Sequence, residues 1–219
     1  MSGLSGLYAV LDVDAVAARG LDAALVAEAM LDGGAAALQL RAKRLGTRPL
    51  LAHAEVLAAL AASFGVPFFV NDRVDVALAV GAGVHLGQSD LPVACLRRIA
   101  PATPVGLSTH TLDQLRAALA ACPTYVAFGP VLPTRSKADA EPVVGLDGVR
   151  AAAALAAGTP LVAIGGLAAS HAAAARSAGA SMVAAISGLL PETGPADLAL
   201  SAVRELTAAY ASALRSPCS

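Results

Sequence analysis

Eight short apolar runs of strand length recur along the chain and are separated by alanine-rich segments with helical spacing. Strands without polar alternation are typical of a parallel sheet that is buried on both faces. Eight such strands alternating with helices predict an α/β fold, the (β/α)8 or TIM barrel. The runs are Leu7–Leu11, Ala36–Leu40, Phe68–Val70, Gly83–Leu86, Val105–Leu107, Tyr125–Phe128, Leu161–Ile164 and Met182–Ala185. The clearest helical segments are Leu21–Leu31, Leu50–Ser63, Asp113–Ala121 and Asp147–Ala157.

A doubly wound open sheet is the alternative arrangement of the same elements. The Gly-x-Gly-x-x-Gly signature that often follows the first strand of such a sheet does not occur at that point of the sequence, which favours the barrel. No low-complexity linker divides the chain, and its 219 residues suit one α/β barrel. We therefore expect residues 1–219 to form a single domain.

The composition excludes several classes of protein. A formal net charge of −1, without blocks of one sign, argues against a dedicated nucleic-acid surface. The chain is 57% hydrophobic, but most of the excess is alanine, and no long run of bulky apolar residues predicts a membrane span. The first residues lack the charged start and apolar core of a signal peptide. Three widely spaced cysteines, Cys95, Cys122 and Cys218, fit a reducing compartment. We expect a cytoplasmic protein that binds neither membranes nor nucleic acids.

A barrel of this kind carries its chemistry just after the strand ends, because the loops that follow the strands build the active site. Seven of the eight predicted strands are followed by polar residues or glycines in an otherwise apolar chain. Their shared position predicts one site at the carboxyl end of the barrel. The candidates are Gln39, Arg41, Lys43, Asn71, Asp72, Gln88, Asp90, Ser108, His110, the loop 129–137, and the segments 165–166 and 186–188.

Asp72 and Asp90 follow neighbouring strands and form a candidate metal site. A right-handed strand–helix–strand unit places both strand ends on one edge of the sheet, so the two carboxylates should lie side by side. With Asn71 and Gln88 nearby they suit Mg²⁺, which usually takes one or two protein carboxylates together with substrate phosphates. Alternatively, Asp72 caps the following helix and Asp90 belongs to a turn before Pro92.

Gln39, Arg41 and Lys43 alternate along an extended segment, so all three side chains can point the same way. Two cations and an amide facing a cavity indicate a polyanionic ligand, because arginine offers a bidentate fork and lysine a point charge. A charged rim at the edge of the sheet is the alternative interpretation.

A second anion site is indicated after the sixth, seventh and eighth strands. The loop after the sixth strand contains Thr134, Ser136 and Lys137, whose hydroxyls and ammonium group can donate to an anion. Residues 165–166 and 186–188 end the last two strands, and in barrels that pair of loops frequently forms a phosphate site. Glycine there lets the backbone approach a phosphate closely. An ordinary surface loop is the alternative for the residues after the sixth strand.

Two histidines lie near these strand ends. His85 lies within a predicted strand, where a structural role is more common than a catalytic one. His110 follows Ser108, and we expect it to cap the next helix, with an acid/base role as the alternative.

Taken together, these segments resemble the thiamine phosphate synthase family. The set spans nearly the whole chain in the family's order and is more specific than any single motif. The resemblance implies a barrel transferase of thiamine biosynthesis that joins a hydroxymethylpyrimidine diphosphate to a thiazole phosphate and releases pyrophosphate. The matching segments are QLRAK at 39–43, NDRVDVA at 71–77, GVHLGQSDLP at 83–92, GLSTH at 106–110, FGPVLPTRSK at 128–137, AIGG at 163–166 and AIS at 185–187.

The family's residue roles carry over where the residues match. The resemblance implies that the pyrimidine diphosphate is held by Gln39, Arg41, Lys43, Asn71, Ser108 and Lys137. It implies that Mg²⁺ is bound by Asp72 and Asp90, and that the thiazole phosphate is held by Thr134, Ser136, Gly166, Ile186 and Ser187. The catalytic set would be Arg41, Lys43, Ser108 and Lys137. Its three cations would stabilise the charge that grows on the departing pyrophosphate.

Two other functions are compatible with the same barrel. A thiazole tautomerase of this family would use His110 as its acid or base and would not need the carboxylate pair. A non-catalytic thiamine-phosphate binding module would not need two carboxylates beside a diphosphate either. The expected partners are small-molecule substrates, and the sequence is compatible with a homo-oligomer.

Overall fold

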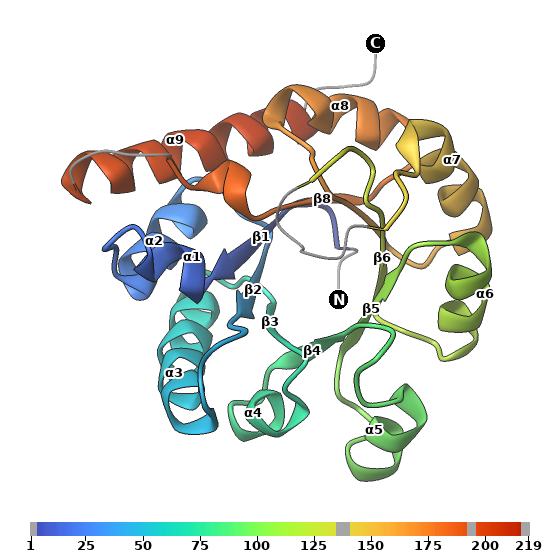
Figure 1. The fold of residues 1–219 in the computed structure, drawn as a ribbon, viewed down its shortest axis with the longest axis horizontal. Coiled ribbons are helices and arrows are strands. Elements are labelled where there is room, and N and C mark those ends of the chain that lie inside the picture. The colour runs from blue at the N-terminus through green and yellow to red at the C-terminus, as the bar shows by residue number, and fades with distance from the viewer. Residues whose placement is uncertain (1–3, 135–140, 192–195, 216–219) are drawn as a thin grey trace.

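A closed barrel of eight parallel strands forms the centre of the computed structural model, which describes residues 4–134, 141–191 and 196–215 (Figure 1). Each strand pairs with its neighbours in chain order, and the last strand returns to the first. The predicted barrel is therefore confirmed, and the open sheet is excluded because no edge strand is left. The strands are β1 (Gly6–Asp12), β2 (Ala37–Arg41), β3 (Phe68–Asn71), β4 (Gly83–Leu86), β5 (Val105–Thr109), β6 (Tyr125–Phe128), β7 (Leu161–Ile164) and β8 (Met182–Ala185).

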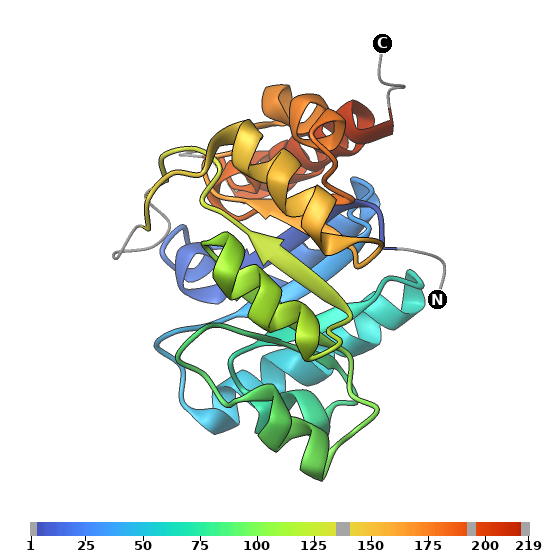
Figure 2. The same cartoon turned by 90° about the vertical axis from the view of Figure 1, so that its right-hand side faces the viewer.

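Helices surround the barrel and cover its outer face (Figure 1). The last helix, red in Figure 1, packs against α2, α8 and β1, so it closes the ring of helices beside the first strand. Figure 2 shows α6 and α7 lying in front of β6 when the barrel is viewed from the side. The described helices are α1 (Val13–Ala17), α2 (Ala23–Asp32), α3 (Thr47–Ser63), α4 (Val74–Ala79), α5 (Val93–Ile99), α6 (Leu112–Ala120), α7 (Gly145–Ala156), α8 (Ala169–Ser177), α9 (Ala196–Arg215) and the short 3₁₀ helix η1 (Ser187–Leu189). Among these, none is long and apolar enough to span a bilayer.

Several strands extend further into polar sequence than their apolar runs predict. Four strands have the predicted bounds, while β2, β3 and β5 run on to include Arg41, Asn71 and Ser108. The ladder continues through these positions, since Arg41 pairs with Asp12 and Asn71 with His85. Three of the predicted site residues are therefore placed by the barrel itself, which holds a side chain more rigidly than a loop does.

Three aromatic rings fill the barrel interior beside two glycines. The rings of Tyr8, Phe69 and Tyr125 meet edge to face, with centroids 5.1 to 5.9 Å apart. A Cβ atom at Gly83 would lie 2.5 Å from the Phe69 ring, and one at Gly106 would lie 2.0 Å from Tyr125. Strands β4 and β5 therefore carry glycine at the positions where large rings from β3 and β6 occupy the interior.

We expect Gly106→Ala to destabilise the fold by about 1–3 kcal/mol or more, because overpacking forces a core to shift. Gly46→Ala is the matched control, since Gly46 has φ −70° and open space around its missing Cβ. Urea denaturation of both variants and the unmodified protein measures the effect. Equal losses for the two alanines would contradict the proposed packing role of Gly106.

Candidate active site

A cavity of about 750 Å³ opens at the carboxyl end of the barrel, where the sequence predicts the site. Side chains and backbone from β2, β3, β5 and the loops after β6, β7 and β8 line it. The predicted site residues that line it are Gln39, Arg41, Asn71, Ser108, Thr134, Gly166, Ile186 and Ser187. Ser136 and Lys137 lie outside the described residues.

Arg41 is held by a carboxylate that the sequence analysis did not select. Its guanidinium forms an ion pair with Asp12, at the end of β1 directly opposite in the ladder. Asp12 is only 6% exposed and also accepts a hydrogen bond from the Ala15 N–H at 3.0 Å, which caps α1. A buried ion pair is favourable only when its remaining polar atoms are bonded, and here they are in part. An aspartate directly after the first apolar run is the signal that would have identified it.

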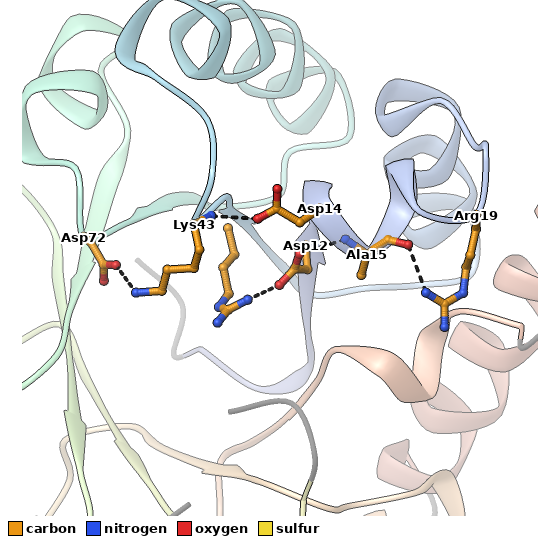
Figure 3. A network of polar contacts seen from close by, with 7 residues as sticks. Asp12, Asp14, Ala15, Arg19, Lys43 and Asp72 are labelled. Atoms are coloured by element: carbon orange, nitrogen blue, oxygen red, sulfur yellow. Dashed lines mark hydrogen bonds and ion pairs between the residues drawn. The ribbon is translucent and has the colours of Figure 1, made fainter. Parts of the chain in front are cut away.

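Lys43 does not lie on the same extended segment as Gln39 and Arg41, contrary to the prediction from their alternation. The extended segment ends at Arg41, so Lys43 lies on the loop after β2, where its side chain is 52% exposed. Its backbone N–H donates to Asp14 at 2.9 Å, and its ammonium group lies 2.5 Å from the Asp72 carboxylate (Figure 3). Lys43 therefore does not line the cavity; it lies beside Asp72 of the candidate metal site.

Asp72 does not cap the helix that follows it. Arg73 occupies the N-cap position of α4 and makes no side-chain capping bond. Asp72 has φ +63°, a left-handed conformation that aspartate tolerates better than most residues, and its N–H donates to the His85 carbonyl at 2.8 Å. Its carboxylate faces Lys43 instead of the helix (Figure 3).

Asp90 lies close to Asp72, as the strand–helix–strand geometry predicts. Burial raises the pKa of the Asp90 carboxyl; a hydrogen bond from the Gly87 N–H opposes this rise, and the neighbouring Asp72 carboxyl adds to it. The 2.6 Å bond from Gly87 also agrees with the turn interpretation, so Asp90 both closes a turn and faces a second carboxylate. Two adjacent carboxylates repel one another, and Lys43 offsets part of that repulsion.

This pair fits a hard divalent cation that also binds a substrate. Within the part of the chain that the structure describes, no group of three or more His, Cys, Asp or Glu side chains could hold a metal ion. Two carboxylates with further oxygens from a substrate are typical of Mg²⁺ rather than of a zinc site. The donor set therefore agrees with the predicted metal and requires a phosphate ligand to complete it.

Ser108 is held from two sides at the end of β5. The Gln88 side-chain amide donates to the Ser108 carbonyl at 2.6 Å. The Ser108 hydroxyl lies 2.8 Å from His85 Nε2, and His85 Nδ1 lies 2.8 Å from the Tyr125 hydroxyl. His85 is 7% exposed and hydrogen-bonded, as expected for a structural histidine, although it also lines the cavity.

His110 lines the cavity but does not cap helix α6, contrary to the prediction. The cap is Thr111, whose hydroxyl accepts from the Gln114 N–H. His110 Nδ1 donates to the Gly129 carbonyl at 2.6 Å, and its backbone N–H donates to Gln114 Oε1 at 2.7 Å. The threonine one residue later has the better capping hydroxyl, which explains the shift.

The loops after β6 and β7 are joined by backbone hydrogen bonds at the other end of the cavity. Val131 N–H donates to the Ile164 carbonyl at 2.9 Å, and Leu132 N–H donates to the Gly165 carbonyl at 3.0 Å. Gly165 and Gly166 have φ +102° and +67°, and a Cβ at either would lie within 2.6 Å of the β6 loop. Glycine is therefore required for these two loops to meet where the phosphate site is predicted.

Comparison with known proteins decides the family. A family model described as "Thiamine monophosphate synthase" matches residues 7–189. This chain belongs to that family. A thiamine-phosphate synthase from Chloroflexus aurantiacus is 41% identical over 203 residues, which cover 92% of this chain and 91% of that protein. Another, from Laribacter hongkongensis, is 45% identical over 193 residues, covering 87% and 90%. The solved structure of a thiamine phosphate pyrophosphorylase from Pyrococcus furiosus is 30% identical, with a TM-score of 0.83 over 97% of this chain and 96% of that one.

Membership of the thiamine monophosphate synthase family confirms the resemblance found in the sequence. The match extends from β1 through η1 and so includes every element that lines the cavity except α9. The alignments cover more than nine tenths of this chain and of the relative in each case, so the similarity extends over the whole barrel and not over one motif.

In metal-free buffer we expect Asp90→Asn to raise the free energy of unfolding at neutral pH. The pKa of Asp90 is raised above its ordinary value of 3.8, so its ionised form is less stable in the folded chain than in the unfolded chain. As the pH falls below the raised pKa toward the ordinary value, the wild-type carboxyl takes up its proton and the difference should shrink. Urea denaturation across this pH range measures it.

Asp113→Asn is the control for that experiment. Asp113 is 91% exposed and forms a surface ion pair with Arg116, so its removal should change stability by less than about 1 kcal/mol. A destabilised Asp90→Asn at neutral pH, or a stabilisation independent of pH, would be inconsistent with a raised pKa of the Asp90 carboxyl.

Proposed function

We propose that this chain is a thiamine-phosphate synthase that joins a hydroxymethylpyrimidine diphosphate to a thiazole phosphate. The observation that carries the proposal is the cavity itself. It brings Gln39, Arg41, Asn71 and Ser108 together, with the Asp72–Asp90 pair and Lys43 nearby, in a chain of this family. The names of the relatives support the same activity.

The reaction needs charge stabilisation more than it needs a protein nucleophile. The bond between the pyrimidine methylene carbon and the diphosphate oxygen breaks, and pyrophosphate leaves with the electron pair. The thiazole nitrogen then forms the new bond to the methylene carbon. Arg41 and Lys43, with Lys137, would hold the diphosphate and stabilise the charge that grows on it. Asp12 keeps the Arg41 guanidinium at the cavity wall.

Asp72 and Asp90 would hold Mg²⁺ against the diphosphate. Bound Mg²⁺ would offset the negative charge of the leaving group. Lys43 lies beside Asp72 and would hold part of the same diphosphate. Asn71 and Gln39 would place the pyrimidine ring, because both line the cavity from neighbouring strands.

The thiazole phosphate would bind where the loops after β6, β7 and β8 meet. Thr134, Gly166, Ile186 and Ser187 line that end of the cavity. Ser136 belongs to the same proposed set but lies outside the described residues. The close backbone contact between the loops leaves no space for a side chain at Gly166.

The two other functions are less well supported. A tautomerase would use His110, which lines the cavity. Proton transfer alone would not require the adjacent carboxylates of Asp72 and Asp90. A binding module would not need that pair either. The two relatives and the solved structure described above carry synthase or pyrophosphorylase names.

We expect Lys137→Ala to lower kcat with a smaller effect on binding of the pyrimidine diphosphate, because charge grows on the leaving group in the transition state. His110→Ala should change pyrophosphate release much less. If the chain were a tautomerase the order would reverse, since a positioned acid or base typically contributes 10²–10⁴-fold. Both variants should be assayed for pyrophosphate release and for thiazole isomerisation. A wild-type protein that isomerises the thiazole and releases no pyrophosphate would refute the synthase assignment.

We expect Asp72→Ala and Asp90→Ala to fold normally and to lose Mg²⁺-dependent pyrophosphate release by on the order of 10²-fold or more, the scale of removing one electrostatic stabiliser. Titration of Mg²⁺ at fixed substrate measures it, and thermal unfolding verifies the fold. Asp113→Ala is the control, because its side chain is 91% exposed in a surface pair. Wild-type activity of both variants at limiting Mg²⁺ would exclude the metal assignment.

A further inference from the structure

Five side chains from five strands form one hydrogen-bonded chain across the barrel interior. Gln39 Nε2 lies 3.0 Å from the Tyr8 hydroxyl, which lies 2.6 Å from the Tyr125 hydroxyl. Tyr125 in turn lies 2.8 Å from His85 Nδ1, and His85 Nε2 lies 2.8 Å from the Ser108 hydroxyl. Both ends of this chain, Gln39 and Ser108, are proposed to contact the pyrimidine substrate and line the cavity.

The two tyrosine hydroxyls are not explained by packing. Phenylalanine would fill the same space at positions 8 and 125, and Phe69 already does so beside them. A buried hydroxyl without a hydrogen-bond partner is unfavourable. Both tyrosine hydroxyls therefore need the partners that the hydrogen-bonded chain gives them. The His85 ring stacks on Tyr125 at 14° with centroids 5.6 Å apart, which fixes its orientation.

The protons along this chain can be counted. Burial raises the pKa of both Tyr8 and Tyr125, so each phenol keeps its single proton near neutral pH. The Gln39 amide donates to Tyr8, so within the described residues the acceptor left for the Tyr8 proton is the Tyr125 hydroxyl. Tyr125 then gives its proton to His85 Nδ1, which acts as the acceptor.

We propose that His85 is a positioning residue that sets the direction of the Ser108 hydroxyl. With Nδ1 accepting, the neutral imidazole carries its proton on Nε2 and donates it to Ser108 Oγ. The Ser108 proton is then directed into the cavity, toward an acceptor such as a ring nitrogen of the pyrimidine substrate. This inference rests on the proposed function, since it names the group that Ser108 recognises. The opposite polarity, with Ser108 donating to His85, would instead offer the substrate a lone pair.

The tautomer of His85 tests the proposal without any assay of activity. Nitrogen-15 NMR of the full chain distinguishes a protonated from an unprotonated ring nitrogen, and the spectrum of His85→Gln assigns the signals. We expect Nε2 protonated and Nδ1 unprotonated in the wild-type protein. A proton on Nδ1, or on both nitrogens near neutral pH, would overturn the proposal. Because the measurement needs no substrate, it stands even if the synthase assignment fails.

Kinetics tests whether His85 acts through Ser108. A glutamine can place its amide N–H₂ near the Nε2 position, whereas the shorter asparagine reaches only the Nδ1 position. We expect His85→Asn to lower kcat/KM for the pyrimidine diphosphate by about 2- to 12-fold, the scale of one neutral hydrogen bond, with the KM for the thiazole phosphate unchanged. His85→Gln should retain most of the activity.

The double variant His85→Asn with Ser108→Ala gives the decisive comparison. If His85 acts only by orienting Ser108, the double variant should match Ser108→Ala alone. Multiplying losses would mean that His85 acts independently, and the proposal would be wrong. If the asparagine variant does not fold, Tyr125→Phe breaks the same chain one bond earlier, and its loss should likewise vanish when Ser108 is alanine.

Discussion

Closure of the barrel around Tyr8, Phe69 and Tyr125 is the constraint on which the rest of the structure depends. Three edge-to-face rings fill the interior only because Gly83 and Gly106 leave space for them. Two of the rings carry hydroxyls, and a buried hydroxyl must find a partner. The packing of the core therefore extends a polar chain to Gln39 and Ser108, on opposite sides of the cavity wall. The side chains that fill the barrel interior therefore also hold Gln39 and Ser108 of the candidate site.

Two cations at the carboxyl end of the barrel are each paired with a carboxylate. Asp12 pairs with Arg41, which lines the cavity. Lys43 faces Asp72 (Figure 3). In the proposed function, Lys43 would hold the diphosphate, and Asp72 and Asp90 would hold Mg²⁺. Burial raises the pKa of the Asp90 carboxyl, and the neighbouring Asp72 carboxyl adds to this rise.

Much of the site could be predicted because barrel chemistry follows the strand ends. Gln39, Arg41, Asn71 and Ser108 line the cavity as their positions after apolar runs indicate, and Asp72 and Asp90 lie together as the strand–helix–strand geometry requires. Other features depended on single hydrogen bonds. Asp12 was missed because its role is visible only opposite Arg41 in the ladder, and Thr111 rather than His110 caps α6.

The sequence by itself determined the eight strands, their order and the end of the barrel that carries the chemistry. Strands buried on both faces must be continuously apolar, and polar residues are tolerated only where each strand ends. The tertiary structure alone decided which polar groups meet. Tyr8 and Tyr125 are 117 positions apart in the chain, and their hydroxyls come within 2.6 Å only when the barrel closes. The direction of the hydrogen bonds that reach Ser108 depends on that closure, because a proton's position is set by the partner in space and not by the neighbour in sequence.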